Sequence, residues 1–99
     1  MCTMIVNQVA VEGYGKGAGG WFDVRQANVA YDHPFHAPLE HALTIDFVNE
    51  ALGPSARVAV ELTPAAAREL VNTILTVLER AEAGGFLEAS VSQTRAANP

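Results

Sequence analysis

The sequence predicts an α+β fold, a four-stranded antiparallel meander (β-β-β-β-α) with one amphipathic helix packed on one face. Four stretches with the composition or period-two alternation of strands come first, separated by short connections. One long stretch with helical periodicity follows them. Because the connections are short, we expect consecutive strands to pair as antiparallel neighbours.

The first two strands are predicted over residues 3–13, which are rich in β-branched side chains, and 21–33. Between them, residues 14–20 contain four glycines in seven positions, which is typical of a flexible connection or a mobile hairpin. This segment lacks the spacing of a phosphate-binding P-loop, so phosphate binding by Lys16 is the weaker interpretation.

The third and fourth strands are predicted over residues 41–49 and 56–62, joined by a turn. Each places its apolar residues on one face at period two. The residues on that face are Leu43, Ile45 and Phe47 in one strand and Val58, Val60 and Leu62 in the other.

A helix is predicted from Thr63, a competent N-cap, and Pro64, which suits the first helical turn. Gly84 and Gly85 are expected to end it. Its apolar side is formed by Ala67, Leu70, Val71, Ile74, Val77, Leu78 and Ala81. Residues 86–93 are either an added strand or part of a tail, so we predict a single domain over 1–85 and a C-terminal extension over 86–99.

Composition excludes several classes of function. The net charge of −5 with only six Lys and Arg residues leaves no basic surface for nucleic acid or for an anionic membrane. A single cysteine, Cys2, forms no intrachain disulfide, and no signal peptide or membrane span is recognised. We therefore expect a cytoplasmic protein. Cys2 is either a nucleophile activated by a nearby histidine or a buried, inert thiol.

All three histidines lie in one short stretch, YDHPFHAPLEH, at residues 31–41. Pairing the second and third strands around residues 34–40 places His33 opposite His41, Tyr31 opposite Leu43 and Val29 opposite Ile45. Directly opposed side chains are close enough for two imidazoles to share one ion. The helix N-terminus, positive by its dipole, is expected near the same end of the sheet.

A metal site is one interpretation of this stretch. His33, His36 and His41 would hold a divalent transition metal, zinc or iron, with Glu40 as fourth ligand or general base. Tyr31 would act as a hydrogen-bond donor, and Asp32 would orient a ligand. The alternative is that the histidines are structural, either bonded to backbone carbonyls or exposed on a turn. Trp21, Tyr31 and Phe35 either line a small apolar pocket or pack in the core.

Several motifs together resemble a known family. CTMIV, GKGAGGW, YDHPFHAPLEH, IDF and GPSARVAVEL are similar to segments of a family of small actinobacterial proteins of unknown function, over residues 2 to about 80. The resemblance implies membership and transfers no activity or catalytic residue.

Two functions from different classes follow. The first is a small metal-dependent enzyme that acts on a small organic molecule through the histidine cluster. The second is a metal-free homodimer that binds a small ligand or a partner protein. A dimer is expected because the sheet face opposite the helix would expose an apolar patch that a second chain covers. Residues 86–93 of one chain would pair with the edge strand of the other. The patch comprises Phe22, Val24, Ala30, Ala42, Val48 and Ala59.

Overall fold

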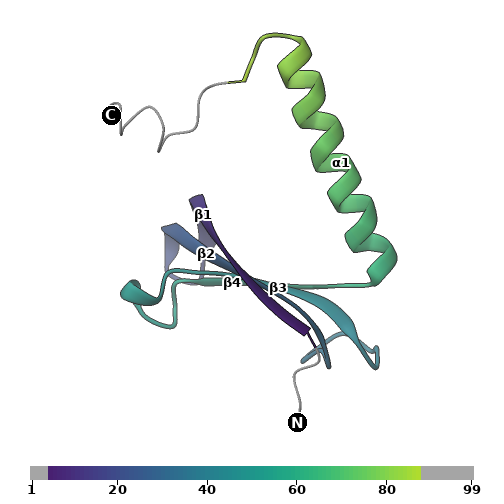
Figure 1. Cartoon of the computed structure of the whole chain (residues 1–99). Coiled ribbons are helices and arrows are strands. Elements are labelled where there is room, and N and C mark those ends of the chain that lie inside the picture. The colour runs from purple at the N-terminus through teal and green to yellow at the C-terminus, as the bar shows by residue number, and fades with distance from the viewer. Residues whose placement is uncertain (1–4, 88–99) are drawn as a thin grey trace. The chain divides into compact units, whose positions relative to one another are not determined.

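The computed structural model describes residues 5–87 and confirms the α+β class. In chain order the elements are β1 (Ile5–Gly17), β2 (Gly20–Asp32), β3 (Ala42–Val48), the 3-10 helix η1 (Glu50–Leu52), β4 (Arg57–Leu62) and α1 (Pro64–Ala83) (Figure 1). The chain divides into two compact units, one ending at Pro64 and the other beginning at Ala65. Each unit is described by itself.

The sheet is an antiparallel meander with strand order β1-β2-β3-β4. The predicted register is confirmed on both sides of β3. Tyr31 pairs with Leu43 and Val29 with Ile45 across β2 and β3. Across β3 and β4, Leu43 pairs with Leu62, Ile45 with Val60 and Phe47 with Val58. The alternation of apolar residues excludes a one-residue slip, which would turn every side chain to the other face, and the lengths of the connecting segments set the rest of the register.

The glycine-rich segment is not the flexible connection that its composition suggests. β1 continues to Gly17 and β2 begins at Gly20, so only two residues lie between the strands. A bulge between Ala10 and Gly13 interrupts the β1–β2 pairing, and such bulges increase the bend of a strand. A Cβ atom on Gly17 would lie 3.1 Å from the carbonyl oxygen of Arg57 and 3.2 Å from that of Ser55. A side chain at position 17 would therefore press on the backbone around the start of β4, which the end of β1 approaches closely.

The buried apolar core of the described residues is small, comprising Val24, Ala27, Ala42 and Ala56. Ala42 is fully buried and Val24 nearly so, which makes the predicted apolar patch wrong at these two positions. Their side chains are covered within the chain and are unavailable to a partner. Among the large apolar side chains that are exposed, three lie on the edge strand β1, at Ile5, Val6 and Val9.

The turn between β3 and β4 is organised by Asn49, the buried polar residue among those described. Its side-chain oxygen accepts the N–H of Ala51 at 3.1 Å and caps η1. Its amide nitrogen donates to the carbonyl of Asp23 at 2.9 Å, and its backbone N–H donates to Ala56. One side chain therefore connects this turn to β2.

The helix α1 ends close to the predicted position. Gly85 has φ of +76°, and the N–H of Phe86 donates to the carbonyl of Ala81 at 2.8 Å, which is the pattern of a glycine-terminated helix. Its packing on the sheet stays a prediction. Phe86 and Leu87 form no strand, and residues 88–93 of the predicted added strand lie outside the described residues. No helix within residues 5–87 is long and apolar enough to cross a membrane.

Candidate functional site

His33 and His41 lie together at the loop end of the β2–β3 hairpin, directly after β2 and directly before β3. Their ring centroids are 4.7 Å apart, and Tyr31 stacks on His41 at 5.8 Å. The prediction that His33 and His41 face each other is therefore confirmed. It follows from the β2–β3 register, which continues past the last paired residues, Asp32 and Ala42, by one step.

A backbone contact orients the imidazole of His33. Its Nδ1 lies 2.9 Å from the carbonyl oxygen of Glu40, and because a carbonyl only accepts, Nδ1 carries the hydrogen. In the neutral ring this leaves Nε2 with a free lone pair, the tautomer that metal-binding histidines use. Asp32, predicted to orient a ligand, instead accepts the backbone N–H of His33 at 2.7 Å.

His36 is held at a different place in the loop of residues 33–41, called the His loop below. Its backbone N–H donates to both carboxylate oxygens of Glu61, at 3.1 and 3.3 Å. Glu40 is exposed, and its contact with His33 uses the backbone carbonyl. Among the described residues, no group of three or more His, Cys, Asp or Glu side chains lies close enough to hold a metal ion. The geometry thus brings together two of the three predicted ligands.

Glu61 of β4 holds the middle of the His loop. It accepts the N–H of Phe35 at 2.6 Å and that of Ala37 at 2.7 Å, besides that of His36. The backbone N–H groups, Ala37 first and then Phe35, lower the pKa of the Glu61 carboxyl below its ordinary value, and the nearby His36 adds to this effect. Glu61 is therefore ionised at neutral pH and forms charge-assisted hydrogen bonds.

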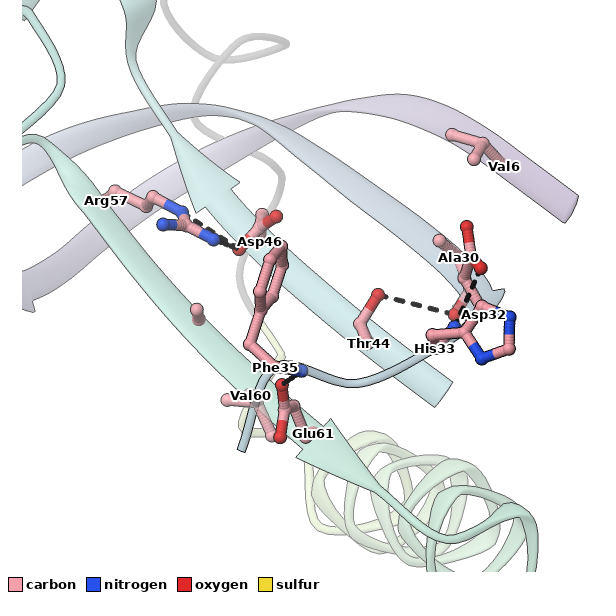
Figure 2. A pocket seen from close by; sticks show the side chains of 11 residues that line it. Val6, Ala30, Asp32, His33, Phe35, Thr44, Asp46, Arg57, Val60 and Glu61 are labelled. Carbon is pink, nitrogen blue, oxygen red and sulfur yellow. Dashed lines mark hydrogen bonds and ion pairs between the residues drawn. The ribbon is translucent and has the colours of Figure 1, made fainter. Parts of the chain in front are cut away.

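A hollow of about 410 Å³, open to solvent, lies between the His loop and the sheet (Figure 2). Its floor is formed by small apolar and hydroxyl side chains of β1 to β4, and Figure 2 shows Phe35 pointing from the loop into the space between Glu61 and the Arg57–Asp46 pair. The lining residues are Val6, Ala30, Asp32, His33, Phe35, Thr44, Asp46, Arg57, Ala59, Val60 and Glu61.

Charges in the hollow are mainly negative. Three acidic residues, Asp32, Asp46 and Glu61, line the hollow together with one arginine, Arg57. Arg57 donates through Nε and Nη2 to the same oxygen of Asp46, at 3.0 and 2.8 Å. A neutral or positively charged ligand is favoured in such a field over an anion.

Phe35 is the aromatic side chain of this hollow and is 94% exposed, although its own backbone N–H is bonded to Glu61. The prediction that Trp21, Tyr31 and Phe35 line one apolar pocket is wrong, and its alternative, core packing, is wrong for Trp21 and Phe35, which are 70% and 94% exposed. Trp21 lines a separate hollow with Tyr14 and Val24, and Tyr31 stacks on His41. Trp21 lies near the start of β2, Tyr31 near its end, and Phe35 in the His loop.

Sequence reasoning missed Glu61, Arg57 and Asp46. The signal for Arg57 and Asp46 was present, because the β3–β4 register places them in neighbouring pairs on one face of the sheet, Asp46 opposite Ala59 and Arg57 opposite Val48. For Glu61 the register predicts the sheet face on which its side chain lies, but it does not predict how the His loop folds over that side chain. Such a loop conformation depends on contacts between distant residues, which periodicity does not reveal.

A model of a protein family described as a family of unknown function (DUF6295) matches residues 1–87. No curated protein and no solved structure matches the chain.

Proposed function

Because the chain belongs to the DUF6295 family, whose function is unknown, we propose a function from the geometry alone: the protein binds a small, flat molecule in the hollow beneath the His loop. Phe35 is the observation that carries this proposal. A phenyl ring left 94% exposed loses the free energy of burial, yet the backbone that bears it is fixed by hydrogen bonds. A ring so placed is prepared to stack on a ligand.

The chemistry of the lining narrows the class of ligand. The floor at Ala30 and Ala59 leaves room for a planar group against the sheet, and Phe35 offers a face for stacking. The carboxylates of Asp32 and Asp46 favour a positive charge on the ligand. We propose an aromatic or similarly flat molecule that is neutral or cationic, held by stacking and by hydrogen bonds to the polar rim.

Three probes that share a phenyl ring and differ in charge test this proposal: phenethylammonium, 2-phenylethanol and 3-phenylpropionate. We expect saturable shifts of the backbone amide signals of Phe35, Ala30 and Ala59 in NMR titrations, strongest with the cation and weakest with the anion. Phe35→Ala is expected to abolish them, whereas Trp21→Ala, which removes an aromatic residue of another hollow, leaves them unchanged. Absence of saturable shifts with all of the probes would refute ligand binding at this hollow.

A divalent transition metal at His33 and His41 is a second candidate. It is supported by the ring separation of 4.7 Å and by the bond of His33 Nδ1 to Glu40, which leaves Nε2 free to bind an ion. Zinc or iron would need further ligands, from His36 after a loop movement, from water or from a second chain. In that proposal Glu40 and Tyr31 keep their predicted catalytic roles, toward a small organic substrate.

Elemental analysis of untagged protein grown in metal-replete medium tests the second candidate. We expect a zinc or iron content near one equivalent per site, lost in His41→Ala. Less than about a tenth of an equivalent, with no uptake on reconstitution, would refute it. Far-UV circular dichroism serves as the control, since His41 lies at the end of a strand and its replacement should leave the sheet and helix signals unchanged.

We propose a homodimer for the assembly. β1 is an edge strand, and its segment IVNQVAV has exposed β-branched residues at Ile5, Val6 and Val9 with no lysine or proline to block pairing. A second copy offers an identical strand and a two-fold arrangement. Sedimentation equilibrium at micromolar concentration tests this, and a single species at the chain mass of 10.5 kDa would refute it.

We also propose that the protein is cytoplasmic, which the presence of a single cysteine supports.

A further inference from the structure

The contact between Glu61 and the His loop uses each backbone N–H that lies between two prolines. Pro34 and Pro38 carry no N–H, and the residues between them are Phe35, His36 and Ala37. All three of these N–H groups donate to the Glu61 carboxylate, over distances of 2.6 to 3.3 Å. The prolines therefore delimit a segment whose donors all serve one acceptor.

Converging backbone N–H groups form a concave site that suits an anion. A carboxylate fits this site well because its two oxygens offer about four positions for a hydrogen. In this chain Oε2 of Glu61 accepts the N–H of Phe35, and Oε1 accepts the N–H of Ala37. The N–H of His36 donates to both oxygens. A carboxamide would have one such oxygen and would present N–H groups to the other donors.

The position of Glu61 in the sheet explains why the contact also shapes the hollow. Glu61 pairs with Thr44, which pairs with Ala30, so the three residues form one row across β4, β3 and β2. Thr44 and Ala30 line the hollow. The carboxylate therefore draws the His loop back over this row and places Phe35 at the edge of the hollow.

We infer that residues 35–37 form a backbone site for a carboxylate, that Glu61 fills this site as an internal ligand, and that Glu61 is thereby the residue that positions Phe35 for ligand binding. The last part rests on the proposed function. The first two parts depend only on the hydrogen bonds. A carboxylate on a separate molecule should enter the same site once the Glu61 side chain is removed.

The experiment uses the Glu61→Ala variant of the full chain, with acetate as the external carboxylate and chloride at equal ionic strength as the control. In wild type we expect the amide hydrogens of Phe35, His36 and Ala37 to exchange slowly. In Glu61→Ala they should exchange at least about tenfold faster. Acetate should restore slow exchange in a saturable way, and chloride should not. Wild type should show no response to acetate, because its site is full.

Two further variants keep the result interpretable. Glu61→Gln preserves the size of the side chain and should lose part of the protection at the three amides, without rescue by acetate. Glu50→Ala removes an exposed carboxylate of η1 and should leave all three unchanged. Full protection in Glu61→Ala, full protection in Glu61→Gln, or an equal response of wild type to acetate would overturn the inference.

Phenethylammonium distinguishes this inference from the proposed function. If both are correct, Glu61→Ala binds the probe at least about tenfold more weakly, and acetate restores binding. A different result is that wild type fails to bind the probe while acetate restores slow amide exchange in Glu61→Ala. This result would support the carboxylate site and refute the proposed ligand site. If Glu61→Ala binds the probe as wild type does, the positioning role of Glu61 is overturned.

Discussion

The first and second hairpins of the sheet reach order by opposite means. β1 and β2 are joined by a two-residue turn, and their glycines allow the backbone of β1 to approach that of β4. β2 and β3 are joined by the much longer His loop, which is held down by the side chain of Glu61. The comparison shows that glycine content and loop length are poor guides to order. Backbone approach fixes one hairpin, and a carboxylate from a distant strand fixes the other.

The largest expected effect comes from filling the close approach in the first hairpin. Gly17→Ala places a Cβ against the carbonyl oxygens of Arg57 and Ser55, at 3.1 and 3.2 Å. Since both obstacles are backbone atoms, we expect a loss of about 1–3 kcal/mol in the free energy of unfolding, measured by urea denaturation.

Gly19→Ala is the matched control for this substitution. A Cβ at Gly19 meets no atom within 4 Å, so the same chemical change should alter the free energy of unfolding by less than about 0.5 kcal/mol. Equal losses in the two variants would show that the glycines of this hairpin serve flexibility and that the close approach is unimportant.

A side chain also holds the third hairpin, and its removal should have the next largest effect. Asn49→Ala removes a buried side chain and leaves the carbonyl of Asp23 and the N–H of Ala51 without this partner. We expect a loss of about 1–2 kcal/mol in thermal or urea unfolding. Asn49→Asp keeps the capping oxygen but sets a buried carboxylate against the carbonyl of Asp23, so its loss should be at least as large. No loss in Asn49→Ala would mean that this turn, unlike the His loop, is ordered by its backbone alone.

These cases also show what the sequence could predict. The alternation in β2, β3 and β4 gave the strand pairs and the meeting of His33 with His41, because period and register are local properties. The position of His36 could not be predicted from the sequence, because it depends on a hydrogen bond to Glu61, 25 residues away in the chain. Glycines at 15 and 17 resembled a flexible loop because composition does not reveal what a Cβ would meet.

The contact that holds the second hairpin should depend on pH in a defined direction. Backbone N–H donors lower the pKa of Glu61, so the carboxylate favours the closed loop. The contact is fully present above the ordinary value of 4.5 and is lost only as the pH falls through the lowered pKa of the folded state. The other titratable and charged residues that line the same hollows as Glu61 are His36, His33, Arg57, Asp32 and Asp46.

Amide chemical shifts of Phe35 and Ala37, followed from neutral to acidic pH, measure this transition. We expect them to stay constant down to pH 4.5 and to change together below it. A transition centred above that value would contradict the lowered pKa. The shift of Gly17 should remain constant over the same range, because no carboxylate holds the first hairpin at that point.

The smallest effect on stability is expected at the tip of the second hairpin. Phe35→Ala removes a side chain that is 94% exposed, so the free energy of unfolding should change by less than about 0.5 kcal/mol. Its amide should remain protected, because the hydrogen bond to Glu61 uses the backbone. A large loss of stability would show that the ring is packed in solution and is unavailable to a ligand.

The approach of β1 to β4 also bears on the order in which the sheet assembles. Neighbouring strands in the meander are consecutive in sequence, so their contacts close short loops and can form early. Gly17 meets Arg57 only when four strands are in place, and the entropy of closing that long segment must be overcome first. We therefore expect this contact to be absent from the folding transition state. Gly17→Ala would then leave the folding rate nearly unchanged and accelerate unfolding, so the close approach acts mainly on the lifetime of the folded chain.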